Sequence, residues 1–112
     1  MAETFDFPDD LRAAQQESRQ VTAELEALYR ELPWSVEPHP GFTAREGDHF
    51  PTERPATEGW TPEQQEKVEQ LRARQRELAT TVITHPYWST EAVSGDVVAA
   101  RMALKRLFPP VA

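Results

Sequence analysis

The chain has 112 residues, a formal net charge of −7 and no cysteine. Its length allows one domain at most, and the lack of cysteine excludes disulfides, thiolate metal ligands and cysteine nucleophiles. No apolar run approaches the roughly 20 residues of a membrane helix, and the acidic N-terminal segment lacks a signal-peptide pattern. We therefore expect a cytoplasmic protein that does not cross a membrane.

A first helix is predicted over residues 8–32. Pro8 suits the first helical position, and Asp9 and Asp10 place negative charge near the positive end of the helix dipole. Small or apolar residues then recur at alternating spacings of three and four, the pattern of a coiled-coil seam. The residues of this seam are Leu11, Ala14, Ser18, Val21, Leu25, Leu28 and Leu32. Pro33 then ends the helix.

The next segment, residues 33–60, is predicted to be a long irregular loop because prolines and glycines recur through it. These are Pro33, Pro38, Pro40, Gly41, Gly47, Pro51, Pro55 and Gly59. A connection of this length in a compact domain is usually functional or disordered. We expect Trp34 and Trp60 to pack near the end of the neighbouring helices and the middle of the loop to be mobile.

A second helix is predicted over residues 61–84. Thr61, Pro62 and Gln64 form a capping box with a proline at the first helical position. A second seam follows in Gln64, Val68, Leu71, Gln75, Leu78 and Val82. Pro86 then ends the helix or kinks it.

The two seams match when the helices are laid antiparallel. Leu11 then faces Val82, and the polar residues Ser18 and Gln75 fall in one layer, which can fix the register. The sequence therefore predicts a helical hairpin. The same pattern also suits pairing between two chains, so a homodimer is an alternative.

A corner is predicted over residues 85–93 and a third helix over residues 94–108. The apolar face of this helix comprises Val97, Val98, Ala100, Met102, Leu104, Leu107 and Phe108. Because a two-helix hairpin leaves its seam half open to water, we expect this face to pack across the seam. The predicted fold is all-α: an antiparallel coiled-coil-like helical hairpin with a third packed helix and a long proline-rich loop.

No motif for catalysis, for a cofactor or for a metal stands out in the sequence. Three histidines, His39, His49 and His85, could be combined with Asp48 or Glu46 into a metal site. Their spacing, however, matches no metal motif. Glycine-rich phosphate loops and nucleophile elbows are absent from the sequence. We therefore expect a protein that is not an enzyme and that holds no cofactor or metal.

The aromatic residues of the loop are the remaining candidates for a site. Trp34, Phe42, Phe50 and Trp60 either cap the end of the helical core or form a binding surface, since Trp and Tyr are enriched at interaction hot spots. The acidic surroundings would suit a basic protein partner. We therefore predict that the chain is a protein-interaction module, with these four residues as candidate partner contacts.

The charge distribution supplies two alternatives. Residues 1–60 hold 13 acidic and 5 basic residues, whereas residues 61–112 hold 6 acidic and 7 basic residues. The excess of acids disfavours binding to phosphate backbones, so nucleic acid is an unexpected partner. A nucleic-acid-associated regulator would use the cations of the second half, which are Arg72, Arg74, Arg76, Arg101, Lys105 and Arg106. An acidic mimic of nucleic acid is a third possibility.

Several segments carry a resemblance to known sequences. They are residues 7–15, 32–38, 59–62, 71–78, 84–88 and 98–105. With them, nearly the whole chain resembles a group of small uncharacterised actinobacterial proteins. The resemblance implies a family and a source, and it implies no activity, ligand or catalytic residue.

Overall fold

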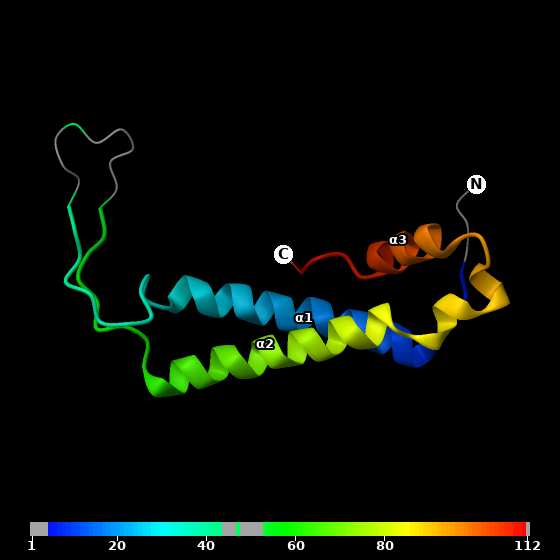
Figure 1. Ribbon diagram of the computed structural model, residues 1–112, viewed down its shortest axis with the longest axis horizontal. Coiled ribbons are helices and arrows are strands. Elements are labelled where there is room, and N and C mark those ends of the chain that lie inside the picture. Colours follow the sequence, from blue (N-terminus) through cyan, green and yellow to red (C-terminus); the bar gives the residue numbers. More distant parts are fainter. Residues whose placement is uncertain (1–4, 44–46, 48–52, 112) are drawn as a thin grey trace.

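The structure, a computed structural model, describes residues 5–43, 47 and 53–111. It contains three α-helices, α1 (Asp9–Glu31), α2 (Pro62–Ile83) and α3 (Val97–Leu107), and two short 3₁₀ turns, η1 (Pro86–Ser89) and η2 (Glu91–Val93). α1 and α2 lie side by side and run in opposite directions, as Figure 1 shows. These residues form no strand, so the predicted all-α class, with a third packed helix, is confirmed.

The ends of the hairpin helices follow from the local sequence. α2 begins with a capping box, in which the Gln64 N–H donates to Thr61 Oγ1 at 3.1 Å and the Thr61 N–H donates to Gln64 Oε1 at 2.8 Å. The prediction that Pro8 takes the first helical position is wrong. Pro8 has an extended ψ of 148° and caps α1, because its carbonyl already accepts the helical hydrogen bond of the Arg12 N–H at 3.1 Å.

The hairpin is held by buried side chains at the interface between α1 and α2. We call this group the hairpin core: Ala14, Val21, Leu25, Leu32, Val68, Leu71 and Leu78. All of its members lie on the two predicted seams. Full burial of a Val or Leu side chain contributes about 1.5–3 kcal/mol. Burial of the seams therefore accounts for the close packing of the two helices.

Gln75 of the predicted polar layer has a hydroxyl partner on α1. The Gln75 amide donates to Thr22 Oγ1 at 3.0 Å, so the hydroxyl partner is Thr22 and not Ser18. Thr22 follows Ser18 by one helical turn on the same side of α1. The long Gln75 side chain reaches this hydroxyl, whereas Ser18 stays half-buried.

An ion pair crosses the hairpin beside this layer. Arg74 donates to the Glu17 carboxylate through Nε and Nη2, and Nη2 lies 2.7 Å from Oε1. The third nitrogen, Nη1, donates to Glu77 Oε2 at 3.0 Å. The fork of hydrogen bonds from Arg74 holds the pKa of Glu17 below its ordinary value of 4.5. Because the folded chain lowers this pKa, the unfolded chain binds the proton more readily.

This ion pair predicts a pH dependence of stability. The contribution of Glu17 is fully present above pH 4.5, the pKa of the unpaired group, and it is lost as the pH falls through the lowered pKa. In urea titrations between pH 7 and pH 3, Glu17→Gln should therefore be less stable than the native chain at pH 7, and the gap should close toward pH 3. Glu24→Gln, on the exposed side of α1, is the control and should leave the pH profile unchanged. A gap that persists undiminished at pH 3 would contradict this account.

A second group of buried side chains lies at the other end of the hairpin, where the chain turns from α2 into η1 and η2. We call it the corner core: Phe7, Leu11, Tyr87, Trp88, Val93, Ala100 and Leu104. His85 ties this corner to α1, because its Nε2 lies 3.0 Å from Asp10 Oδ2 while its Nδ1 accepts from the Tyr87 N–H at 3.1 Å. The Trp88 indole N–H donates to the Val82 carbonyl. The turn is therefore fixed by side chains and not by its backbone alone.

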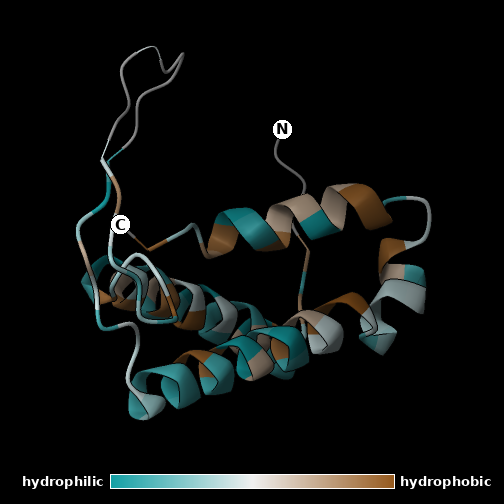
Figure 2. Ribbon diagram, turned by 60° about the vertical axis from the view of Figure 1, so that its left-hand side comes forward, coloured by the Kyte–Doolittle hydropathy of each residue, from teal (hydrophilic) through white to brown (hydrophobic). Residues whose placement is uncertain are grey.

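We expected the third helix to pack across the seam of the hairpin. It does not cover the whole length of that seam. α3 lies over the N-terminal half of α1 in Figure 1 and buries only Ala100 and Leu104. Val98 is 77% exposed and Leu107 is 50% exposed. The reason is the short corner, which sets α3 down beside the first turns of α1 and gives it the corner core to bury against. Figure 2 shows the contrast between the apolar stretches of α3 and the mostly hydrophilic α2.

The molecule is elongated. Its principal extents are 61 × 35 × 22 Å, and its radius of gyration is 20.3 Å, whereas a compact domain of this length has about 13 Å. Two layers of helix and a projecting connection explain the difference. Within the part of the chain that the structure describes, no helix has a stretch long and apolar enough to span a bilayer.

Candidate functional site: an aromatic surface on the connection between α1 and α2

The connection between α1 and α2 folds back on itself as an antiparallel arm. His39 and Thr57 exchange two backbone hydrogen bonds of 2.9 Å, and Phe42 and Arg54 exchange another two of 2.9 Å. The described residues of this arm, 33–43 and 53–60, project from the end of the hairpin that is far from α3 (Figure 1). The described part of this predicted irregular loop thus carries isolated backbone pairs and no strand. The expected mobile middle lies outside the described residues.

The pairing in the arm is sparse because its prolines lack an N–H. The Trp60 N–H donates to the Val36 carbonyl at 2.8 Å, so the paired positions on the first strand of the arm, 36, 39 and 42, lie three residues apart. In a regular antiparallel ladder, hydrogen-bonded pairs recur every second residue. The register that pairs His39 with Thr57 sets Gly41 opposite Pro55, which has no N–H to donate, and the Gly41 N–H donates to His39 Nδ1 at 2.9 Å instead. The arm is therefore a paired segment without regular strands.

Two glycines allow the two sides of the arm to approach closely. Gly41 has φ +83°, and a Cβ at this position would lie 2.6 Å from the Arg54 carbonyl oxygen. Gly59 also has φ +83°, and its Cβ would lie 2.5 Å from the Val36 carbonyl oxygen. Each glycine thus meets the backbone of the opposite side in a conformation that other residues rarely adopt. The arm needs glycine at both positions.

Three rings form a cluster on the arm, which we call the arm cluster: Trp34, His39 and Phe42. The Trp34 ring stands edge-on to His39 at 4.8 Å and to Phe42 at 5.9 Å between ring centroids. The Trp34 indole N–H donates to the Pro55 carbonyl at 2.7 Å, and His39 Nδ1 accepts from the Gly41 N–H at 2.9 Å. Yet Trp34 remains 38% exposed and Phe42 remains 45% exposed. The cluster is therefore ordered by hydrogen bonds and open to solvent.

The other two sequence candidates do not join this cluster. Trp60 packs against the hairpin core, with its ring 6.2 Å from that of Tyr29 and its indole N–H donating to the Pro33 carbonyl at 2.8 Å. It belongs to the end of the hairpin, as we expected for this residue. Phe50 lies outside the described residues. The structure thus brings together Trp34 and Phe42 of the four candidates.

His39 is the member of the cluster that sequence reasoning missed. The sequence predicts His39 only as a histidine of an irregular loop, because its neighbours Pro38 and Pro40 indicate an irregular backbone and nothing more. What places the His39 ring beside that of Trp34 is the backbone pairing of position 39 with position 57. This pairing joins residues far apart in the sequence and leaves no local pattern in it.

The three arginines of α2 are already engaged by other side chains. Arg74 is paired with Glu17 and Glu77, and Arg76 lies 3.2 Å from Glu69. The guanidinium of Arg72 lies 5.8 Å from the ring centre of Tyr29. The three arginines that a nucleic-acid regulator would use on this helix thus have partners within the chain.

Neither a metal-binding group nor a shifted titratable group lies on the described part of the arm. Within residues 5–43, 47 and 53–111, no three His, Asp or Glu side chains are placed to hold a metal ion. The carboxylates with a lowered pKa are Asp10, through its hydrogen bond with His85, and Glu17. Burial raises the pKa of Tyr87 in the corner core. The chemistry that the arm offers is therefore aromatic and apolar contact.

Comparison with known proteins gives one match. The sequence model of a family described as a domain of unknown function, DUF8825, matches residues 10–107, which include α2, α3, the arm and all of α1 but its first residue. No curated protein and no solved structure matches the chain. Because the family match spans most of its length, the chain belongs to the DUF8825 family.

Proposed function

We propose that this chain is a non-enzymatic protein-interaction module, with the arm cluster as its binding surface. The observation that carries the proposal is the solvent exposure of Trp34 and Phe42 in a cluster whose geometry is set by hydrogen bonds. Nearly half of the Phe42 side chain faces water although its ring contacts other rings. Such exposure is costly for a single chain and is recovered when a partner covers the rings.

The arm cluster has the properties of an interaction hot spot. Trp is among the residues that contribute most to binding free energy at interfaces. The polar N–H of Trp34 already has a partner in the Pro55 carbonyl, so covering the ring does not leave this donor unpaired. The rings also lose little conformational freedom on binding, because the backbone pairs at His39 and Phe42 hold them in place.

The charge of the arm favours a basic partner. Residues 33–60 hold five acidic residues and two arginines, a balance of −3. A Lys or Arg side chain of a partner can lie over the face of Trp34, which attracts cations through its ring quadrupole. The arginines of α2 are engaged by Glu17, Glu69 and Tyr29 and so add little attraction for a phosphate backbone. A protein partner therefore has more support than a nucleic acid.

The test is an affinity capture of the tagged chain from the lysate of its source, with the retained proteins identified by mass spectrometry. Phe42→Ala and Trp34→Ala should each reduce the retained partner at least tenfold. The free energy of unfolding of the hairpin should change by less than about 0.5 kcal/mol, as is typical of exposed positions. Val36→Ala is the matched control, because Val36 is 43% exposed on the same arm and lies outside the cluster.

Two results would count against the proposal. If both variants retain the partner as well as Val36→Ala does, the arm cluster is not the binding surface. If either variant lowers the free energy of unfolding by several kcal/mol, the rings serve the folded core. Retention of nucleic acid alone, removed by raised salt, would favour the regulator reading instead.

A further inference from the structure

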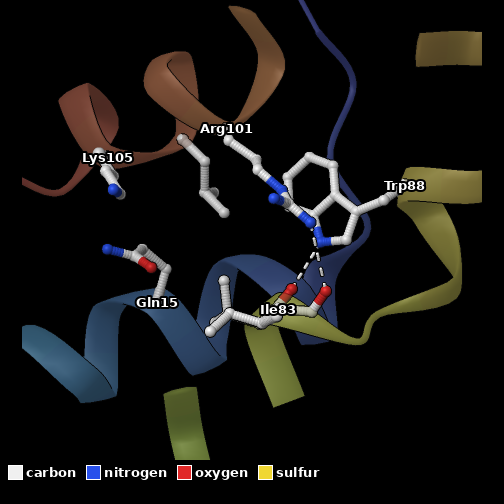
Figure 3. Close-up of a pocket in the computed structure, with 7 residues that line it drawn as sticks. Gln15, Ile83, Trp88, Arg101 and Lys105 are labelled. Carbon is white, nitrogen blue, oxygen red and sulfur yellow. Dashed lines mark hydrogen bonds between the residues drawn. The ribbon is translucent and has the colours of Figure 1, made fainter. Parts of the chain in front are cut away.

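A pocket of about 260 Å³ lies where α3 leans over the hairpin, at the opposite end from the arm. Its lining comes from α1, the end of α2, η1 and α3. The residues are Gln15, Val82, Ile83, Trp88, Arg101, Leu104 and Lys105. Figure 3 shows the side chains of Arg101 and Lys105 descending from α3 toward Gln15 and Ile83. The lining is thus mostly apolar, with one amide and two cations.

Gln15 supplies a buried polar side chain to the wall of the pocket. Gln15 is only 8% exposed, although it is a polar residue on a helix that is otherwise buried through apolar side chains. Among the described residues, no hydrogen-bond partner contacts its side chain, and no fully enclosed side-chain nitrogen or oxygen lacks a partner. The Gln15 side chain lines the pocket, so its amide meets water there. A ligand in the pocket can therefore replace this water as the hydrogen-bond partner of the amide.

Two cations, Arg101 and Lys105, line the pocket. The guanidinium of Arg101 lies 5.4 Å from the ring centre of Trp88, and its Nη2 lies 3.5 Å from the Ile83 carbonyl oxygen. In the described part of the chain, no Asp or Glu pairs with Arg101 or Lys105, in contrast to Arg74 and Arg76 of α2. Among the residues that the structure describes, no acidic side chain lines the pocket. Its field is therefore positive within a chain whose net charge is −7.

We propose that this pocket binds a small carboxylic acid with an apolar body. The carboxylate would lie between Arg101, Lys105 and the donating N–H₂ of Gln15, and the body would contact Val82, Ile83 and Leu104. A dry apolar cavity of about 150 Å³ holds benzene, so about 260 Å³ has room for one ring and a short acid chain. A bare inorganic anion would leave the apolar walls uncovered. The site is separate from the arm and goes beyond the proposed interaction.

The probe for this site is 3-phenylpropionate, and 3-phenylpropan-1-ol is its uncharged counterpart. Binding is followed by NMR of the indole N–H signals, because the chain has three tryptophans and only Trp88 lines the pocket. The Trp88 signal should shift with the acid, whereas those of Trp34 and Trp60 should stay. The alcohol should bind at least tenfold more weakly, since it has no charge for Arg101 and Lys105.

Lys105→Gln tests the charge without disturbing the fold, because Lys105 is exposed. It should weaken 3-phenylpropionate binding about tenfold, and Gln15→Leu should weaken it as well. Arg106→Gln, an exposed neighbour on α3 that does not line the pocket, is the matched control. The proposal is overturned if the Trp88 signal does not move, if the alcohol binds as well as the acid, or if Lys105→Gln binds as well as Arg106→Gln.

Discussion

Leu104→Ala should lower the free energy of unfolding of the corner core by about 2–5 kcal/mol, the range for buried Leu-to-Ala changes. Leu104 is 1% exposed and is one of the largest fully buried side chains that the structure describes. Its removal leaves a void among Leu11, Trp88 and Ala100, which the short α3 cannot fill. A chain of 112 residues is stabilised by roughly 6–17 kcal/mol in total, so the loss is a large fraction. Urea denaturation followed through the Trp88 indole signal measures it.

The control for this prediction lies on the same helix. Leu107 carries the same side chain three residues later but is 50% exposed, so Leu107→Ala should cost less than about 0.5 kcal/mol. Equal losses for the two variants would mean that α3 buries a different face from the one described. A small loss for Leu104→Ala would mean that α3 contributes little to the corner core.

Gly41→Ala should break the pairing of the arm while leaving the hairpin folded. The left-handed φ of +83° costs an L-residue roughly 1–2 kcal/mol, and the added Cβ at 2.6 Å from the Arg54 carbonyl adds a clash with backbone that cannot move aside. NMR should show loss of the contacts between His39 and Thr57 and between Phe42 and Arg54. If the arm cluster is the binding surface, partner capture should fall with them.

The comparison that isolates the clash is Gly95→Ala. Gly95 has a similar φ of +81°, but nothing lies within 4 Å of a Cβ added there, and it is remote from the arm. This variant should carry the conformational cost alone and leave the arm contacts intact. Gly59→Ala should behave like Gly41→Ala, because its Cβ would meet the Val36 carbonyl. Intact arm contacts in both arm variants would show that the two sides are not in close approach.

The hairpin could be predicted because its causes are local. The seams repeat with the helical period, and the hairpin core contains only residues from them. The capping box at Thr61 is written in consecutive residues, and it forms as expected. Such features need no knowledge of distant parts of the chain. The family resemblance is likewise shown for residues 10–107, whereas an actinobacterial source stays a prediction.

The position of α3 could not be predicted because its apolar face is wider than the surface available to it. Val98, Met102 and Leu107 share the helical period with Ala100 and Leu104, so the sequence marks them all as core. Which of them is buried depends on where the corner sets the helix down, and that depends on contacts such as His85 with Asp10, 75 residues apart in the chain.

The arm cluster was predicted in part for a similar reason. Large aromatics in a proline-rich segment mark Trp34 and Phe42 as unusual without any structure. The partner of each is set by pairing between the two sides of the arm, such as the bond from the Trp34 indole to Pro55. Trp60 has the same composition signal as Trp34 but packs against the hairpin core. Trp34 and Trp60 therefore differ in their surroundings in the folded chain, although the sequence gives the same signal for both.

The division of the buried side chains into two cores has a consequence for cooperativity. Of the side chains that the structure describes, Val82 alone packs against both the corner core and the hairpin core. Two units joined through so small a shared surface can open in separate steps, as neighbouring repeats in an array do. The corner and α3 can then open while α1 and α2 stay paired. Opening would break the Val82 contact and the hydrogen bond from Arg19 Nε to the Phe108 carbonyl at 2.6 Å.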